Sequence, residues 1–206
     1  MKKRTAYYFL LLATFSITIL QSCKKKDAKD PYADVKGNYF SIRQFALDEW
    51  NTFKGEPFLI TKTLKEVRGE SKKVSDMANA KVDSSLTNSD TLNWGNIFEI
   101  FFATDISDRK YLGHYTFSQF DDNVEGTRNF YYKADDDDLF TQKLLITVDI
   151  TNNKVMGIYI ETFKKTIWSE TKQNLYYAPM KTIQIQTDER PSIGSRKYTV
   201  LQYYFQ

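Results

Sequence analysis

In the second half of the chain, apolar and polar residues alternate at every second position, which is the period of a β-strand with one buried face. Leu144, Ile146, Val148 and Ile150 lie at alternate positions with mostly polar neighbours between them. The polar sequence TNN at 151–153 separates this run from the next, as a hairpin turn does. Similar runs cover 111–120, 127–133, 140–150, 154–167, 173–177, 181–187 and 197–205. Short turns between neighbouring runs predict successive hairpins, and therefore an antiparallel meander.

A helical pattern precedes these strands at residues 42–53. Its apolar positions recur at helical spacing until a glycine and a proline end the run: Ile42, Phe45, Ala46, Trp50 and Phe53. Ser41 and Gln44 match the S-x-x-Q capping box, in which side chains bond the first backbone N–H groups of a helix. Phe40 and Phe45 match the hydrophobic staple around that box. We therefore predict an amphipathic helix over 42–53.

A second helical pattern, at residues 94–103, is rich in aromatic rings. Its apolar positions follow the spacing i, i+3, i+4, i+7, i+8: Trp94, Ile97, Phe98, Phe101 and Phe102. Asp90 or Asn93 could cap it. Between the two helices, a strand is expected at 58–67, a polar loop at 68–81 and a partner strand at VDSSL, residues 82–86.

These patterns predict an α+β fold. Two N-terminal amphipathic helices pack on a curved, mainly antiparallel β-meander sheet, and residues 38–206 form a single domain. The single histidine, His114, falls on the opposite side of its strand from Tyr111, Tyr115 and Phe117, so it is expected to face solvent.

The N-terminus has the layout of a secretory signal peptide. Three basic residues at positions 2–4 precede an uncharged stretch, 5–22, and the next charge is Lys24. The apolar part of that stretch is shorter than the ~20 residues that a membrane-spanning helix needs. We therefore expect a cleaved leader and not a permanent transmembrane anchor.

Leu20, Gln21, Ser22 and Cys23 resemble the lipobox of bacterial lipoproteins, and the lysines that follow resemble lipoproteins of the Bacteroidetes type. The resemblance implies lipidation of Cys23 and signal-peptide cleavage between Ser22 and Cys23. It also implies a membrane-anchored, acylated (palmitate-bearing) envelope protein. Lys24, where an aspartate would retain such proteins at the inner membrane, implies the cell outer membrane. Residues 23–37, charged and without apolar periodicity, would then be a flexible tether.

Charge and cysteine content restrict the chemistry. The chain has 29 Lys and Arg against 26 Asp and Glu, but the leader holds three of the basic residues, so the remaining chain is balanced. A balanced chain lacks the basic footprint of a nucleic-acid-binding protein. The single cysteine, once acylated, leaves no thiol for a disulfide or a metal site, and no cofactor motif is present.

One hairpin carries candidate calcium ligands. Asp121, Asn123 and Glu125 stand at positions 1, 3 and 5 of a calcium loop, and a glycine follows at position 6. Tyr132 replaces the bidentate glutamate expected at position 12. A polar hairpin tip explains the same residues. The acidic run at 135–138 is a second candidate, with a solvated turn as the alternative.

Three tyrosine pairs lie on predicted strands: Tyr131 with Tyr132, Tyr176 with Tyr177, and Tyr203 with Tyr204. Neighbouring residues of a strand point to opposite faces, so one ring of each pair should enter the core. The other ring could bind a ligand or a partner.

The sequence shows no catalytic motif, so we expect a lipid-anchored envelope protein that binds an unknown ligand or envelope partner without catalysis. An alternative is a structural or assembly component of the envelope. A glycan hydrolase that uses two carboxylates is a third interpretation, because pairs of Asp and Glu are too common in this chain to exclude it.

Overall fold

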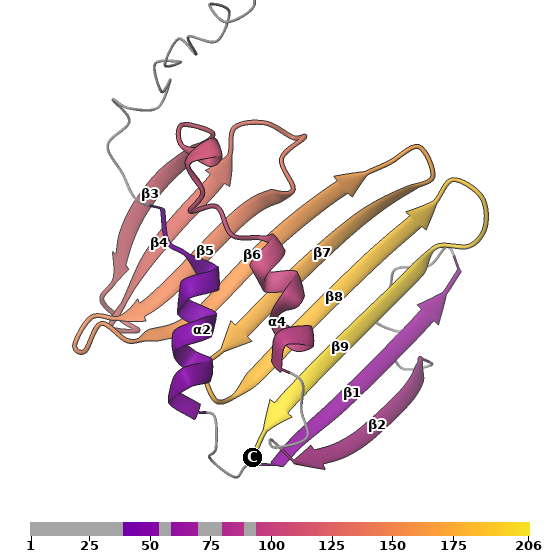
Figure 1. Ribbon diagram of the computed structural model, residues 1–206, viewed down its shortest axis with the longest axis horizontal. Coiled ribbons are helices and arrows are strands. Elements are labelled where there is room, and N and C mark those ends of the chain that lie inside the picture. The colour runs from indigo at the N-terminus through magenta and orange to yellow at the C-terminus, as the bar shows by residue number, and fades with distance from the viewer. Residues whose placement is uncertain (1–38, 54–58, 70–79, 89–93) are drawn as a thin grey trace, which may run out of the picture. The chain divides into compact units, whose positions relative to one another are not determined.

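The computed structural model describes residues 39–53, 59–69, 80–88 and 94–206. Within these residues, nine strands form one antiparallel sheet, and the helices α2 (Ile42–Phe53) and α4 (Trp94–Ala103) lie over one of its faces (Figure 1). This arrangement fits the predicted α+β class. The predicted signal peptide, Cys23 and the tether at 23–37 lie outside the described residues.

The strand order across the sheet is β2-β1-β9-β8-β7-β6-β5-β4-β3. The strands are β1 (Leu59–Arg68), β2 (Lys81–Asn88), β3 (Tyr115–Asp122), β4 (Thr127–Ala134), β5 (Thr141–Asp149), β6 (Val155–Lys165), β7 (Ser169–Ala178), β8 (Thr182–Pro191) and β9 (Lys197–Phe205). The seven strands from β3 to β9 follow one another as hairpins, which confirms the predicted meander. The β1–β2 hairpin extends the sheet because β1 pairs with β9, placing Ile60 opposite Phe205.

Strand register collects the apolar residues on the face beneath the helices, called the helix face below. One row across the sheet consists of Leu144, Ile160, Leu175, Ile185, Leu201 and Leu64. The next row consists of Ile146, Ile158, Tyr177, Ile183 and Tyr203. Side chains at the positions between them point to the other side, called the open face. Because the period is two, a slip of one residue would expose a whole row.

The start of α2 is fixed by a cap from two parts of the chain. The Ser41 hydroxyl accepts a hydrogen bond from the Gln44 backbone N–H (3.1 Å) and donates one to the Asp105 carboxylate (2.7 Å). The same carboxylate accepts the Arg43 backbone N–H (2.8 Å). The predicted Ser41 cap is therefore confirmed, but the Gln44 side chain donates to Asp48 instead of returning to the cap. The Phe40 and Phe45 rings pack with centroids 5.7 Å apart, as the staple predicts.

The rings of α4 pack on the sheet as expected. Trp94, Ile97, Phe98 and Phe101 are buried. The Phe98 ring meets the Tyr177 ring edge-on at 5.3 Å, and the Trp94 ring lies 5.6 Å from that of Phe205. Among the described residues, no helix has the length and apolar character that crossing a membrane requires.

Three strand boundaries were predicted wrongly. β7 begins at Ser169, four residues before the predicted run at 173–177, and β8 ends at Pro191, four residues after the predicted run at 181–187. The run at 111–120 begins as a strand only at Tyr115, because Arg109–Tyr111 form a short 3₁₀ turn and Gly113 has a positive φ of 80°. A left-handed glycine interrupts an extended strand although the apolar alternation continues through it. His114 consequently lies in the bend before β3 and is half-buried, not on the solvent side of a strand.

Replacing Asp105 by alanine should lower the free energy of unfolding at pH 7 by about 1–2 kcal/mol, because α2 loses part of its N-terminal cap. Burial raises the pKa of Asp105, but hydrogen bonds from Ser107, Ser41 and Arg43 outweigh burial and hold it below the ordinary value of 3.8. A lowered carboxyl pKa stabilises the fold above that ordinary value, and the stabilisation is lost as pH falls through the folded-state pKa. Urea unfolding of both proteins at several pH values should therefore show the difference shrinking below pH 3.8.

Asp108→Ala is the matched control for this substitution. Asp108 caps only the 3₁₀ turn Arg109–Tyr111 and is exposed, so its loss should cost less than about 0.5 kcal/mol. Equal destabilisation by the two substitutions would contradict the role assigned to Asp105.

Candidate functional site

Three hollows border helix α4, each of a volume that holds a small ligand. The interhelical groove, about 450 Å³, lies between α2 and α4 and is lined by Ala46, Leu47, Trp50, Trp94, Gly95, Phe98 and Phe102. The strand-side groove, about 420 Å³, is lined by Asn96, Ile97, Glu99, Ile100, Ala103, Gln173, Ile185, Leu201 and Tyr203. The third hollow, called the C-terminal hollow because it lies at the C-terminal end of α4, has a volume of about 420 Å³. It is lined by Ala103, Asp137, Asp138, Phe140, Phe163, Lys164 and Lys165.

The interhelical groove is the most apolar of the three. Its floor consists of buried Trp94 and Phe98, and its rim includes Leu47, which is 41% exposed, and the half-buried rings of Trp50 and Phe102. The ring centroids of Trp50 and Trp94 lie 5.2 Å apart. None of its lining residues that the structure describes is titratable. The groove can therefore bind an apolar group but has no side chain of its own to transfer a proton.

Helical spacing explains how this groove forms. Ala46 and Leu47 lie one turn before Trp50 on α2. On α4, Trp94, Phe98 and Phe102 recur at every fourth residue. These two faces meet over the sheet. Gly95 and Ala46 have little or no side chain, so the space between the larger rings stays open. The sequence predicted four of the large lining residues, Trp50, Trp94, Phe98 and Phe102, as apolar helix positions but not Leu47. The small residues Ala46 and Gly95 were the available sign of a groove.

A hydrogen-bonded pair of a half-buried carboxyl and a buried phenol lies next to the groove. A smaller cavity touches three of the groove's rings, Trp50, Trp94 and Phe98, and is also lined by Glu49 and Tyr177. The Tyr177 hydroxyl donates a hydrogen bond to Glu49 Oε2 at 2.9 Å. Burial raises the pKa of Glu49, and the hydrogen bond from Tyr177 opposes that effect only in part. Burial also raises the pKa of Tyr177 far above the physiological range.

The strand-side groove has an amphiphilic lining. Ile97 and Ile100 of α4 face Ile185 and Leu201 of the sheet, and the remaining lining side chains are mostly polar. Gln173 among them donates a hydrogen bond to Thr187 (3.1 Å). This groove could accept a molecule with both polar and apolar parts.

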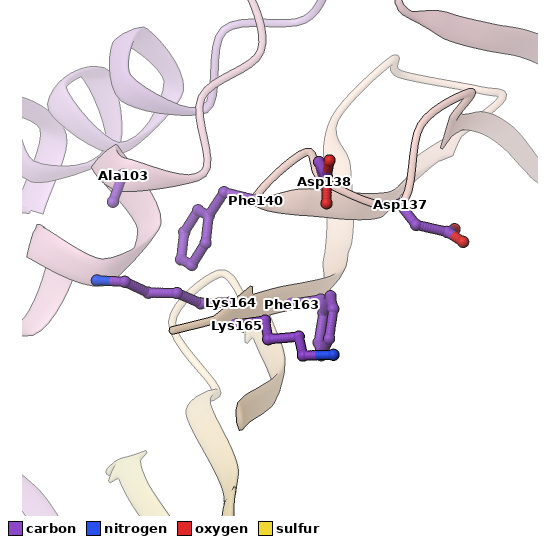
Figure 2. Close-up of a pocket in the computed structure, with 7 residues that line it drawn as sticks. All are labelled: Ala103, Asp137, Asp138, Phe140, Phe163, Lys164 and Lys165. Atoms are coloured by element: carbon purple, nitrogen blue, oxygen red, sulfur yellow. The ribbon is translucent and has the colours of Figure 1, made fainter. Parts of the chain in front are cut away.

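The C-terminal hollow combines aromatic rings with fixed charges. Figure 2 shows Phe140 pointing into it from the connection between β4 and β5, and Lys164 extending toward Ala103. The carboxylates of Asp137 and Asp138 stand at the opposite rim from Lys165. Exposed charges of both signs suit a hydrated polar group better than an apolar one.

The tyrosine pairs divide between the two faces as predicted. Tyr132, Tyr177 and Tyr203 are buried on the helix face. Their neighbours Tyr131, Tyr176 and Tyr204 point to the open face from β4, β7 and β9, so intervening strands separate all three rings. The structure does not gather them into one row. Ligand binding by these tyrosines stays a prediction.

The two acidic loops lie at opposite ends of β4, because 123–126 precede that strand and 135–138 follow it. On the strands that flank the first loop, the Arg128 guanidinium donates two hydrogen bonds, of 2.8 and 2.9 Å, to the Asp121 carboxylate. Asn123 and Glu125 are exposed. In the described part of the chain, no three His, Cys, Asp or Glu residues are grouped to hold a metal ion. Calcium binding by Asp121, Asn123 and Glu125 stays a prediction.

Replacing Glu49 by glutamine should stabilise the fold at pH 7 by about 0.5 kcal/mol, a value that allows for partial solvent screening. A carboxyl whose pKa is raised on folding costs stability once pH rises above its ordinary value, here 4.5. Glutamine keeps an acceptor for the Tyr177 hydroxyl but carries no charge. Thermal unfolding should show the gain at pH 7 and no gain below pH 4.5.

Glu99→Gln provides the matched control, because Glu99 is exposed on α4. It should change stability by the same small amount at both pH values. A loss of stability in the Glu49 variant at pH 7 would show that the charged form is favoured by its surroundings.

No family model matches this chain, and no curated protein sequence does. Among solved structures, the chain is similar to the crystal structure of a LolA superfamily protein from Nitrosomonas europaea, with a TM-score of 0.24 and 10% sequence identity. The likeness covers 80% of this chain and 92% of the other. A likeness at this TM-score does not show a shared fold.

Proposed function

We propose that this chain is a lipid-anchored protein of the cell envelope that binds an apolar or amphiphilic small molecule in the interhelical groove, without transforming it. One observation carries the binding role: a groove of about 450 Å³ that is partly open to solvent and whose described lining residues are aromatic, aliphatic or glycine. Water on such a surface is displaced favourably, at roughly 25 cal/mol per Å² of apolar area buried. An acyl chain or an aromatic ring is the kind of group that gains most.

The lining favours a small ligand over a reaction. Glu49 lines the small cavity next to the groove, where it already accepts a hydrogen bond from the Tyr177 hydroxyl. Asp105, another half-buried carboxylate, caps α2. A hydrolase would need two carboxylates facing one cleft, and the described lining residues of the interhelical groove include none.

The anchor rests on the sequence. The leader, the lipobox at Leu20–Cys23 and the charged tether together support acylation of Cys23 and attachment to the outer membrane. Acyl chains would hold the groove beside a surface where amphiphiles concentrate. Membrane attachment and an apolar groove are therefore compatible parts of one role.

A structural or assembly role is the second candidate, and one observation favours it. β2 is an outermost strand of the described sheet and carries Val82 and Leu86 exposed on its open face. An edge strand with apolar side chains can accept a strand from a partner protein.

Leu47→Asp should weaken binding of a fluorescent fatty acid by tenfold or more, about 1.4 kcal/mol. The aspartate carboxylate that replaces Leu47 would lie in the apolar groove and lose its hydration when the acyl chain of the fatty acid binds. Fluorescence titration of the purified protein gives the dissociation constant, and circular dichroism confirms that the variant is folded. Leu47 is 41% exposed, so the fold should tolerate the change.

Ile150→Asp is the control, because Ile150 is similarly exposed, at 37%, and does not line the groove. It should leave the dissociation constant unchanged. Equal weakening by both variants, or by neither, would contradict binding in the interhelical groove. A stoichiometric envelope protein that competes with the fatty acid would favour the assembly role.

Cys23→Ala should abolish incorporation of labelled palmitate and leave the leader attached, so the chain should migrate as a longer polypeptide. Metabolic labelling and electrophoresis of the membrane fraction measure both effects. Ser107→Ala, at an exposed serine, is a control that should change neither. A variant at Cys23 that is still acylated and cut to the same size would refute the anchor.

A further inference from the structure

Three large apolar side chains project into solvent at one end of the sheet. Ile167 and Trp168 form the turn between β6 and β7, and Ile193 lies in the turn between β8 and β9. Their exposed fractions are 81%, 71% and 87%. Because β6 to β9 are successive antiparallel strands, both turns lie at the same end (Figure 1). Ile167, Trp168 and Ile193 are called the double tip below.

Hydrogen bonds join the two turns into one unit. The Ser192 backbone N–H donates to the Trp168 carbonyl at 2.7 Å, and its hydroxyl donates to the Ile167 carbonyl at 3.0 Å. The Thr166 hydroxyl oxygen accepts the Trp168 backbone N–H at 3.2 Å. The backbone that bears the three apolar side chains is therefore held in place although the side chains themselves are exposed.

The two hairpins that bear the double tip carry an excess of positive charge. The hairpin segments 164–172 and 188–197 contain six lysines and arginines against three carboxylates. Glu170 and Asp188 are each shared between two cations. Lys164 and Lys165, which directly precede the β6–β7 turn, are exposed. The acidic run at 135–138 precedes β5 at the same end of the sheet, and Asp137 and Asp138 line one hollow with Lys164 and Lys165. Cations are therefore in excess within the two hairpins themselves, and carboxylates adjoin them on the β5 side.

We propose that the double tip inserts into the interface of an anionic phospholipid bilayer. Tryptophan favours the membrane–water interface, the isoleucines gain from burial among acyl chains, and neighbouring lysines attract anionic headgroups. This contact is separate from the acylated cysteine and from the interhelical groove. It would give the tethered domain a fixed orientation on the membrane.

A second copy of the chain fits this surface less well. A stable protein interface buries roughly 800 Å² on each partner, which three side chains on two turns do not supply. Like charges around the two tips would also repel one another. A bilayer needs only the three apolar groups to enter it.

A fluorescent label at the double tip tests the contact. The chain has one cysteine, Cys23, which acylation would block, so Ile193→Cys introduces the thiol that nitrobenzoxadiazole labels. The full mature protein, purified from membranes, is mixed with phosphatidylglycerol–phosphatidylcholine vesicles. We expect a blue-shifted, brighter emission that brominated lipid quenches. Adding Trp168→Ser should lower the ratio of inserted to free label about tenfold, the effect of losing one large apolar side chain from the bilayer.

Val124→Cys is the matched control. Val124 is an aliphatic residue, 93% exposed, in the β3–β4 turn at the opposite end of the sheet, so its label should not respond. Equal responses at positions 193 and 124, or none at 193, would overturn the proposal. So would a response at 193 that depends on protein concentration without vesicles, since that indicates self-association. An equal response in pure phosphatidylcholine would overturn the role of anionic headgroups. Labelling of the protein without an introduced cysteine measures any free Cys23 thiol. A missing acyl anchor is therefore distinguished from a failure of the double tip to insert.

Discussion

The ring of Tyr177 joins both helices to the sheet. It packs against Phe45 of α2 and against Phe98 and Phe101 of α4, with ring centroids 5.3–6.3 Å apart. A buried phenol needs a partner for its O–H group, and Glu49 of α2 supplies it. This residue of β7 therefore helps to position both α2 and α4. The interhelical groove depends on that placement, because its walls are the flanks of the two helices that face each other.

Helix length limits how much of the sheet can be covered. Ten to twelve helical residues extend roughly 15–18 Å, whereas a ten-residue strand extends about 33 Å. The sequence follows this limit along each strand. The aliphatic row that contains Leu175 and Ile185 gives way to a polar row: Thr162, Gln173, Thr187 and Thr199. Thr162 and Gln173 hydrogen-bond within it at 3.4 Å. Toward this end the helix face therefore carries hydrogen-bonding side chains, of which Thr162 is buried and the other three are half-buried.

Local patterns predicted the elements, and nonlocal packing decided the site. Period-two alternation located the strands of the meander, but nothing near Ile60 indicates that it pairs with Phe205. Ser41 was readable as a cap, whereas Asp105 caps the same helix from 64 positions away. Trp50 and Trp94 were identified as apolar positions. Whether these two rings border a groove depends on how closely α2 and α4 approach each other. The apolar periodicity of each helix does not contain that distance. Tyr111 was assigned to a strand because it continues the apolar alternation, although the positive φ of Gly113 interrupts the extended conformation before β3.

The double tip cannot be explained by folding requirements. Turns favour glycine, asparagine, aspartate and serine, and here Thr166 and Ser192 already supply the hydrogen bonds that close and join the two turns. Exposed Ile167, Trp168 and Ile193 add almost no buried area to the core. Val124, in the turn at the other end, is a single exposed aliphatic beside Asp121, Asp122 and Glu125. The two hairpins that bear the double tip thus combine three apolar side chains with an excess of cations, whereas the β3–β4 turn combines one valine with acidic residues. A difference of this kind supports the proposed orientation of the double tip toward a negatively charged surface.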